Sequence, residues 1–447
     1  MDQDVVAASS APARNPIRSG AEYIESLRGR RLKVYLMGEA VEEPVDHPII
    51  RPSINAVAKT YDLANEDPEL ASAVSPLTGG RVNRFLHISA SPGDLVMQNK
   101  MQRRLGQLTG TCFQRCVGMD ALNSLHSVTY DLDEKYRTDY HVRFKQFLAR
   151  VQSANLVIGG AMTDVKGDRG RSPSQQADPD LFLHVVRHTP EGVYVSGAKA
   201  HQTGCLNSYW LIVMPTMRLE EADKDYAIVG AIPVDAEGIT YIYGRQSCDT
   251  RNAEEGDIDA GNAQFSGQEA MIVFEEVFIP RELVFLDGEF EFASTLVERF
   301  TCYHRRSYVC KHHVTRFPYE IGRLAQDIAG GLMVTLPSER DLRHETIGPL
   351  IEKYLKGRPE VSTEDRIRIL RLVENMTLGR NAVGYLTESM HGAGSPQAQR
   401  IQIARSMQIE FKKELAKALA GVADASSEQI SDDVSTYMAR VFAPVSN

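Results

Sequence analysis

Cysteine is scarce in this sequence, with six residues among 447. That number is too small for a disulfide scaffold, so we expect a reduced, cytoplasmic protein whose cysteines pack in the core or act as ligands. Long apolar runs are missing too, since the longest, Trp210–Met214, is far shorter than the ~20 residues that a membrane span requires. The first residues include acidic side chains and no apolar signal segment. Neither a membrane nor a secreted protein is expected.

Basic residues are not in excess either. Fifty Lys and Arg oppose 59 Asp and Glu, which gives a net charge of −9. Because nucleic-acid binding needs a concentrated positive surface, a nucleic acid is not the expected partner. A hydrophobic fraction of 43% is ordinary for a protein with a substantial core. The length suggests about three domains.

The pattern along the chain predicts an N-terminal segment and three folded regions. Residues 1–18 are rich in Ala, Ser and Pro, and we expect them to be disordered. Residues 19–154 have mostly helical periodicity and open with Ser19 and Glu22, which predict a cap for a short helix. Residues 155–287 contain short β-rich runs bounded by turn residues, which are typical of an antiparallel barrel or sandwich. Residues 288–447 return to helix, so the fold class is α+β.

Two cysteines, Cys112 and Cys116, lie four residues apart. On a helix, both sulfurs would lie on one face, where two soft ligands can hold part of an iron–sulfur cluster or a zinc ion. The same spacing is also typical of two small residues that pack in the core. The spacing alone does not separate these interpretations.

A second group of potential ligands comprises Cys302, His304 and Cys310. A histidine beside a redox cofactor can be a ligand, a base or both, and a satisfied core histidine is the alternative.

Two polar loops lie in the β-rich region, at residues 161–169 and 198–204. They contain donors and small residues that suit the polar edge of a planar cofactor such as a flavin, although ordinary turns have similar compositions. No GxGxxG motif follows a strand, so a Rossmann-type nicotinamide site is not expected.

Taken together, several stretches resemble the 4-hydroxybutyryl-CoA dehydratases, which also isomerise vinylacetyl-CoA and belong to the wider 4-hydroxyphenylacetate 3-hydroxylase family. The stretches are residues 101–122, 159–164, 197–204, 303–308 and 387–400. The resemblance extends from about Ser19 to Gly421, and the Cys-x-Gln-x-Cys motif separates these enzymes from the monooxygenase branch. It implies an acyl-CoA-dehydrogenase-like fold with an N-terminal helical domain, a middle antiparallel β-barrel and a C-terminal helical bundle. It also implies FAD, a [4Fe–4S] cluster, an acyl-CoA substrate, and a homotetramer or dimer of dimers.

The resemblance further implies roles for single residues. The cluster ligands that correspond are Cys112, Cys116 and His304, with Cys310 as the candidate fourth. The residues beside the flavin are Met162, Thr163, His201, Gln202 and Thr203. The catalytic set is His304, Glu269, Tyr308, Glu388 and Gln114.

The implied reaction is dehydration of 4-hydroxybutyryl-CoA to crotonyl-CoA through a flavin-generated radical, with the cluster as Lewis acid on the leaving hydroxyl. His304 is expected to take the α-proton and Glu269 to act as base or acid. Two alternatives remain open: an aromatic monooxygenase that uses reduced flavin and O2, and an inactive, truncated member of the family.

The sequence departs from the family pattern after Tyr308. There the family continues through Gly-Gly-Cys-Lys and several helices, whereas here Val309, Cys310 and Lys311 lead almost directly into Val-Thr-Arg-Phe-Pro-Tyr-Glu. A block of the C-terminal bundle is therefore missing. Either Cys310 replaces the family's cysteine, one residue too close to His304, or the cluster has three protein ligands. A shift of one helical residue turns a side chain by ~100°.

Overall fold

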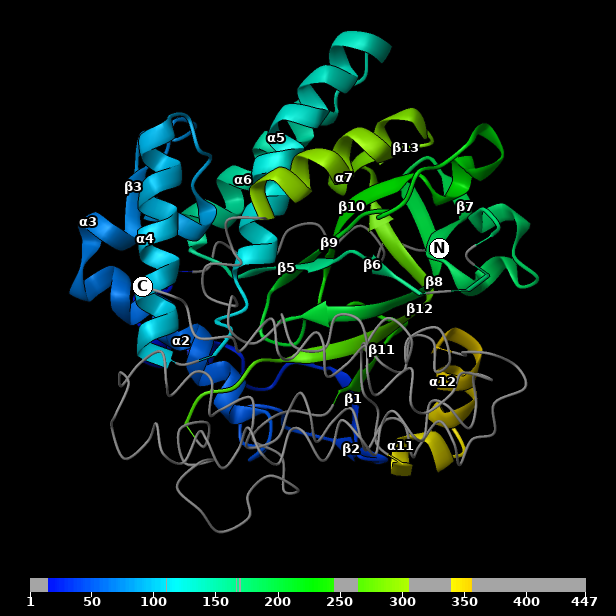
Figure 1. The fold of residues 1–447 in the computed structure, drawn as a ribbon, viewed down its shortest axis with the longest axis horizontal. Helices are drawn as coiled ribbons and strands as arrows, with labels where there is room; N and C mark the ends of the chain where they lie inside the picture. The colour runs from blue at the N-terminus through cyan, green and yellow to red at the C-terminus, as the bar shows by residue number, and fades with distance from the viewer. Residues whose placement is uncertain are drawn as a thin grey trace, which may run out of the picture.

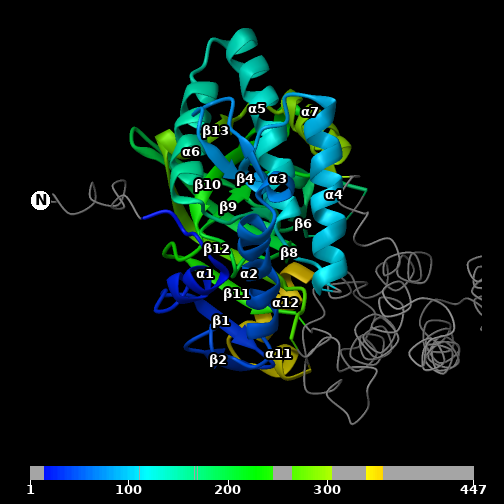
Figure 2. The same ribbon diagram turned by 90° about the vertical axis from the view of Figure 1, so that its left-hand side faces the viewer.

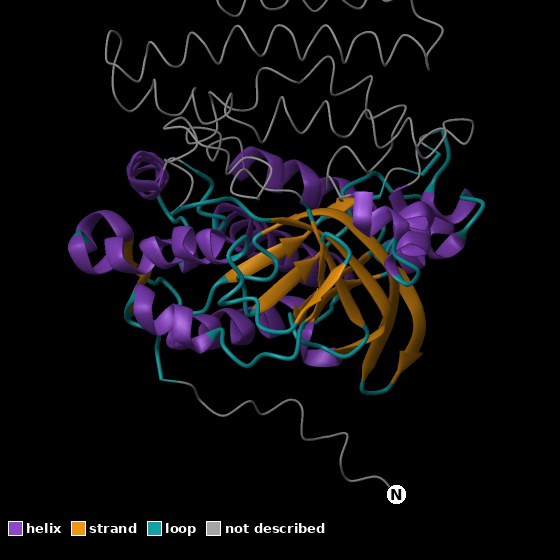
Figure 3. Cartoon of the chain, turned by 90° about the horizontal axis from the view of Figure 1, so that it is seen from below, coloured by secondary structure: helices purple, strands orange, loops and turns teal. Residues whose placement is uncertain are grey.

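A computed structural model describes residues 15–109, 111–165, 167–168, 170–244, 264–304 and 339–355. Within these ranges the chain forms two main β-sheets with helices on both sides (Figures 1 and 3). The helices are α1 (Gly20–Ser26), α2 (Arg51–Glu66), α3 (Pro68–Ala71), α4 (Pro92–Thr109), α5 (Cys116–Tyr136), α6 (Tyr140–Ala154), α7 (Glu291–His304), α11 (Glu339–Arg343) and α12 (Ile347–Leu355). The strands are β1 (Lys33–Leu36), β2 (Glu39–Val41), β3 (Ser72–Val74), β4 (Arg81–Asn83), β5 (Ile158–Ala161), β6 (Thr163–Asp164), β7 (His184–Thr189), β8 (Gly192–Thr203), β9 (Trp210–Val213), β10 (Ile228–Pro233), β11 (Ile239–Tyr243), β12 (Glu269–Pro280) and β13 (Val284–Asp287).

The first helix begins where the sequence predicts its cap. Ser19 Oγ accepts a hydrogen bond from the N–H of Glu22 at 3.1 Å, and α1 ends before Leu27. Ile17 precedes this cap and is buried, and its N–H donates to the carbonyl of Ala154 at 3.2 Å. Of the segment expected to be disordered, residues 15–18 are therefore placed against the folded chain, and residues 1–14 lie outside the described residues.

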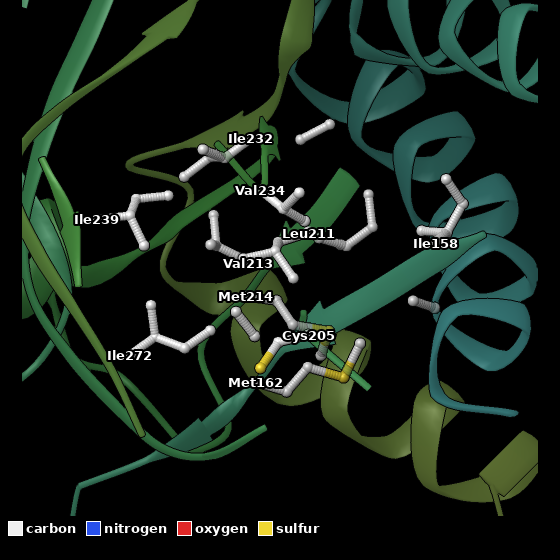
Figure 4. Packing of buried hydrophobic residues seen from close by; sticks show 14 of the residues in the cluster. Ile158, Met162, Cys205, Leu211, Val213, Met214, Ile232, Val234, Ile239 and Ile272 are labelled. Carbon is white, nitrogen blue, oxygen red and sulfur yellow. The ribbon is translucent and has the colours of Figure 1, made fainter. Parts of the chain in front are cut away.

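One sheet has seven strands, in the order β2-β1-β11-β12-β8-β6, with β7 also paired to β8. The other has four, in the order β13-β10-β9-β5. Apolar side chains from both sheets fill the space between them, as Figure 4 shows for Val213 of β9 and Ile272 of β12. Burial of this apolar surface is the main force that holds the sheets together.

The described strands do not form the closed antiparallel barrel that the resemblance implies. They form two open sheets, and two of the pairings are parallel, β1 with β11 and β5 with β9. β1 and β2 come from the N-terminal region that was expected to be mostly helical, although the alternation over residues 31–36 predicts a strand where β1 lies. They extend the sheet beyond β11. The larger sheet is therefore shared between two sequence regions, which local periodicity does not predict.

Helices cover the sheets unequally. α5 and α6 pack on the four-stranded sheet and α7 lies along α5, while α12 contacts β8 of the larger sheet (Figure 1). α2, α3, α4 and the β3–β4 hairpin gather at one end of the molecule, the end that faces the viewer in Figure 2. No helix within the described ranges is both long and apolar enough to cross a membrane.

Candidate functional site

The adjoining ends of β8 and β12 bring three polar side chains together. Because these strands are antiparallel, Glu269 lies opposite Thr203. Thr203 Oγ1 is 2.8 and 2.7 Å from the two carboxylate oxygens of Glu269, and His201 Nε2 is 3.4 Å from Glu269 Oε2. The side chains of His201 and Glu269 are 33% and 25% exposed. The structure thus holds a carboxylate in a fixed orientation and leaves it accessible, as a proton-transfer group requires.

The short strand β6 brings the second predicted flavin segment beside the first. Thr163 lies opposite His201 across the β6–β8 pair. The N–H of Met162 donates to Gln202 Oε1 at 2.8 Å, and Gln202 Nε2 donates to the carbonyl of Thr163 at 2.9 Å. All five residues expected beside a flavin therefore lie together, although Gln202 is buried and holds the neighbouring backbone.

A buried ion pair that the sequence analysis missed fixes this segment. Lys199 is 1% exposed, and its Nζ donates to Asp164 Oδ1, to the carbonyl of Met162 at 3.2 Å and to that of Met214 at 2.8 Å. Asp164 Oδ2 accepts from the N–H and the hydroxyl of Thr216, at 2.9 and 2.7 Å. Since both charges have partners, the burial is tolerated and three chain segments are tied together. A lysine between two alanines of a β-rich run was the available signal.

Glycines allow the first turn of α5 to approach this region closely. A Cβ at Gly118 would lie 1.9 Å from the carbonyl oxygen of Ile158, and one at Gly160 would lie 2.5 Å from Val117 Cγ1. Neither distance is possible for real atoms, so only glycine fits there. The start of α5, with Cys116, is therefore held against β5, next to Met162.

The two cysteines of the motif do not share a helix. Cys112 lies in the loop before α5, and Cys116 is the first residue of that helix and is buried. The helical interpretation of the spacing is therefore wrong, because the chain between them includes Gln114 at a positive φ of 67°. A residue in this conformation interrupts a right-handed helix.

Gln114, which is expected to line the active site, also holds this loop in place. Its Nε2 is 3.0 Å from the carbonyl oxygen of Ser53 and 3.1 Å from that of Ser266, and its Oε1 accepts from Asn207 Nδ2 at 2.7 Å. A Cβ at Gly204 would lie 2.7 Å from Gln114 Cβ. This contact places the loop that contains Cys112 beside Gly204, the residue that follows Thr203.

His304 is brought to the same helix from a distant part of the sequence. It is the last residue of α7, and its Nδ1 lies 3.0 Å from Asp120 Oδ2. Asp120 is fully buried on α5, one turn after Cys116. A carboxylate bonded to one nitrogen of an imidazole is the usual outer support of a metal-binding histidine. The sequence analysis missed Asp120, although its spacing of four from Cys116 was visible.

The expected cluster ligands within the described ranges are two cysteines and a histidine. Within the described ranges, no three side chains of His, Cys, Asp and Glu are close enough to hold one metal ion. Two thiols and a carboxylate-supported imidazole are the donor types that iron–sulfur clusters use, and a cluster spans more space than an ion. Three expected site residues, Cys310, Tyr308 and Glu388, lie outside the described residues.

Two further buried groups occur within these motifs. Burial raises the pKa of the Cys205 thiol to about 12, and Gln268 Nε2 lies 3.3 Å from its sulfur. Figure 4 shows Cys205 beside Met162 at one end of the core. Burial lowers the pKa of Arg115, whose guanidinium lies 4.9 Å from the ring centroids of both Tyr61 and Phe85.

Comparisons with known proteins identify the family of this chain. The family model of the 4-hydroxyphenylacetate 3-hydroxylase N-terminal region matches residues 19–286, and that of the C-terminal region matches residues 294–421. The chain therefore belongs to the 4-hydroxyphenylacetate 3-hydroxylase family.

Relatives in this family include dehydratases. The chain is 48% identical to the 4-hydroxybutyryl-CoA dehydratase/vinylacetyl-CoA isomerase of Clostridium aminobutyricum, over 91% of this chain and all of the relative. It is 61% identical to the structure of an oxygen-tolerant archaeal 4-hydroxybutyryl-CoA dehydratase from N. maritimus, with a TM-score of 0.67, over 95% of this chain and 99% of that one. The resemblance drawn from the sequence is confirmed.

More distant relatives share the fold. A 4-hydroxyphenylacetate 3-monooxygenase oxygenase component in complex with FAD has a TM-score of 0.53 at 18% identity, over 95% of this chain and 99% of that one. The oxygenase component of Thermus thermophilus is 27% identical over 61% of this chain and 56% of its own length.

The alignment with the Clostridium enzyme also supports the missing block. It spans 489 positions, whereas 91% of 447 residues is about 407, so about 80 positions of the alignment have no residue of this chain. The alignment covers the whole Clostridium enzyme, so the unmatched positions are residues of that enzyme that have no counterpart in this chain.

Proposed function

We propose that this chain dehydrates 4-hydroxybutyryl-CoA to crotonyl-CoA and isomerises vinylacetyl-CoA. The observation that carries the proposal is the 48% identity over the full length of a dehydratase, combined with the meeting of β6, β8, β12 and the start of α5 at one place. A monooxygenase function is not favoured, because a monooxygenase relative such as that of Thermus thermophilus is only 27% identical.

The residues present fit the two cofactors that this function requires. FAD would be held by Met162, Thr163, His201, Gln202 and Thr203, and the cluster by Cys112, Cys116, His304 and Cys310. When bound, FAD supplies reversible one-electron transfer and the cluster supplies a Lewis-acidic iron.

The reaction also needs proton transfer by side chains, because the β-proton of the substrate is not acidified by the thioester. Glu269 serves here as base or acid, since Thr203 and His201 orient its carboxylate and solvent or ligand still reaches it. The protonated carboxyl group of Glu269 then donates this proton to the product.

His304 is assigned to the α-proton and to ligation. Its Nδ1 lies 3.0 Å from Asp120 Oδ2, and this contact orients the ring. Asp120 also stabilises the imidazole when it carries the extra proton.

Replacement of Glu269 by Gln tests the proposal. We expect turnover, measured as crotonyl-CoA formation, to fall by at least about a thousandfold while flavin content and far-UV circular dichroism stay at wild-type values, because the amide keeps the shape but cannot transfer the proton. Glu275→Gln, at an exposed position of the same strand, serves as the control and should keep full activity. Full activity in Glu269→Gln would refute the assignment.

A further inference from the structure

A cavity of about 360 Å³ adjoins the candidate site on the side of β6. Its lining begins at Asp164, the last residue of β6, and continues with Val165. Thr163 comes directly before them and lies opposite His201, whose Nε2 is 3.4 Å from Glu269 Oε2. Two residues of chain span at most ~7 Å, so Val165 lies within that distance of Thr163. A single bound molecule can therefore reach from the cavity to the groups proposed for proton transfer.

The cavity combines an apolar floor with a basic rim. Val165, Pro173 and Phe182 line it and are buried. Arg171 and Arg218 also line it, and both are exposed. Pockets of this kind bind a ligand through apolar contacts along its body and a few polar groups that fix its end. The lining therefore suits a molecule with an apolar chain and an anionic end.

The acidic side chains of the lining already have positive partners. Asp164 accepts a hydrogen bond from Lys199, and Asp168 Oδ2 lies 3.3 Å from Arg171 Nε. In contrast, the side chain of Arg218 makes no ion pair or hydrogen bond within the described ranges. A guanidinium group binds phosphate oxygens through two parallel hydrogen bonds. The unmatched charge of Arg218 therefore favours a phosphate group as the anionic end.

The wall that carries Arg171 is held in a fixed conformation by one side chain. Gln176 Nε2 donates to the carbonyls of Asp168 and Arg171 at 2.9 and 3.1 Å, and its Oε1 accepts from the N–H of Asp168 at 2.9 Å. A Cβ at Gly167 would lie 2.7 Å from Gln176 Oε1, so the chain passes closely around this amide. Because the wall is already ordered, less conformational entropy is lost when a ligand binds.

We propose that this cavity binds the diphosphate of a ligand of the reaction centre, an inference that rests on the proposed function. Arg218 binds the diphosphate, and the apolar floor packs against the part of the ligand that leads to the centre. Both expected ligands, FAD and 4-hydroxybutyryl-CoA, carry a diphosphate that is separated from the reacting end by a flexible chain. The shared chemistry is therefore an organic diphosphate, and the affinities of variants distinguish its two sources.

Replacement of Arg218 by Gln tests the site through binding. FAD and riboflavin are titrated into the flavin-free protein by fluorescence, and 4-hydroxybutyryl-CoA and 4-hydroxybutyryl-pantetheine are titrated into the flavin-loaded protein. Riboflavin and the pantetheine thioester keep the reacting ends and lack the diphosphate. We expect the affinity for one diphosphate ligand to fall at least tenfold while the affinity for its truncated analogue stays the same. The remaining affinity should also depend less on KCl concentration, because one charge pair fewer is screened.

The arms of the experiment assign the source of the diphosphate. A loss confined to FAD assigns the flavin, and a loss confined to 4-hydroxybutyryl-CoA assigns the substrate. Arg171→Gln should weaken the same ligand. Arg281→Gln is the matched control, because Arg281 is also exposed and lines a larger cavity, of about 550 Å³, beside Gly192. That cavity lies at the ends of β8 and β12 opposite to Thr203 and Glu269, so both affinities should stay unchanged.

Two results would overturn the inference. Wild-type affinity for both diphosphate ligands in Arg218→Gln would show that this arginine does not bind them. An equal loss for a ligand and its truncated analogue would show that the substitution disturbs the fold and not a diphosphate contact. Either result leaves the proposed function intact, whereas failure of the wild-type protein to bind FAD and 4-hydroxybutyryl-CoA would overturn the proposed function and this inference together.

Discussion

At the scale of single residues, the absence of a side chain is as important to the site as the polar groups. Gly118 and Gly160 remove the atoms that would keep α5 away from β5, so Val117 in the first turn of the helix and Met162 both lie against Gly160. The same helix carries Asp120, the partner of His304, so its approach to β5 also sets the position of that pair.

Gly118→Ala should therefore destabilise the protein. Its new Cβ would meet the Ile158 carbonyl at 1.9 Å, so the helix or strand must shift, which typically costs about 1–3 kcal/mol. Urea unfolding measures the loss of free energy, and flavin content should fall as well. Gly80→Ala, where the nearest atom is 3.7 Å away, should change the free energy of unfolding by less than about 0.5 kcal/mol. Equal stability of the two variants would contradict the packing argument.

At the scale of elements, strands β6 and β8 and the segment after β9 are joined by one ion pair. Lys199 and Asp164 are both buried, and each has its hydrogen bonds satisfied by the other segments. The charges matter here because they hold the Met162 backbone in position beside His201, not because an ion pair adds much stability by itself.

Lys199→Met should leave Asp164 as an uncompensated buried charge. Removal of one partner of such a pair typically costs about 3–5 kcal/mol, and thermal unfolding should show the loss. The double variant Lys199→Met/Asp164→Asn should recover a large part of the stability, since the charge is gone while Thr216 can still donate to the remaining oxygen. If the double variant does not recover stability, the loss in Lys199→Met comes from the missing hydrogen bonds of Lys199 and not from the unbalanced charge.

The contact between α5 and α6 should depend on pH. His126 and His141 have ring centroids 5.1 Å apart, and burial is the main reason that the pKa of each lies below the ordinary value of 6.5, with Lys145 acting in the same direction. The folded protein therefore binds these protons less readily than the unfolded chain does. The two histidines make their full contribution to the free energy of unfolding above pH about 6.5, and this contribution falls as the pH drops towards their pKa values in the folded protein.

We expect urea unfolding to give a lower free energy at pH 5 than at pH 7. His126→Gln should reduce this difference, because the variant has one buried imidazole fewer to protonate. The exposed His188 provides the control, and His188→Gln should keep the wild-type difference. A difference that stays the same in His126→Gln would assign the acid sensitivity to other groups.

At the scale of the whole molecule, the candidate site draws on segments that are far apart in the chain. Glu269 lies opposite Thr203, Gly204 packs against Gln114, and His304 lies beside Asp120 although 184 positions separate them. About 80 positions of the alignment with the Clostridium enzyme have no residue of this chain, so the ligand set of the proposed cluster is best tested by iron content.

Protein purified without oxygen should contain about four irons and four sulfides per chain. Cys116→Ser should lose most of this iron, whereas Cys302→Ser, at an exposed position outside the ligand set, should keep it. Cys310→Ser decides between the two interpretations of the shortened sequence, because iron retention in that variant means three protein ligands. A wild-type protein without iron under these conditions would contradict the cluster assignment.

Much of the site was visible in the residues before the fold was known. The motif with Cys112 and Cys116 and the resemblance to the dehydratases are properties of residue type and spacing, as is the Ser19 cap. The five residues expected beside a flavin lie together in the structure, because β6 and β8 pair, and their role at a flavin stays a prediction. The helix through both cysteines was wrong, because the backbone turn at Gln114 depends on the tertiary contacts of its side chain.

The sequence by itself determined the types of donors, the order of helical and β-rich regions, and the family. Only the tertiary structure decided that β1 joins the larger sheet in parallel, that Asp120 supports His304, and that Lys199 is buried against Asp164. The reason is physical. Local periodicity records which face of a segment is apolar, whereas these pairings arise between residues far apart in the chain, and their free energy exists only when packing has brought them together and removed the water.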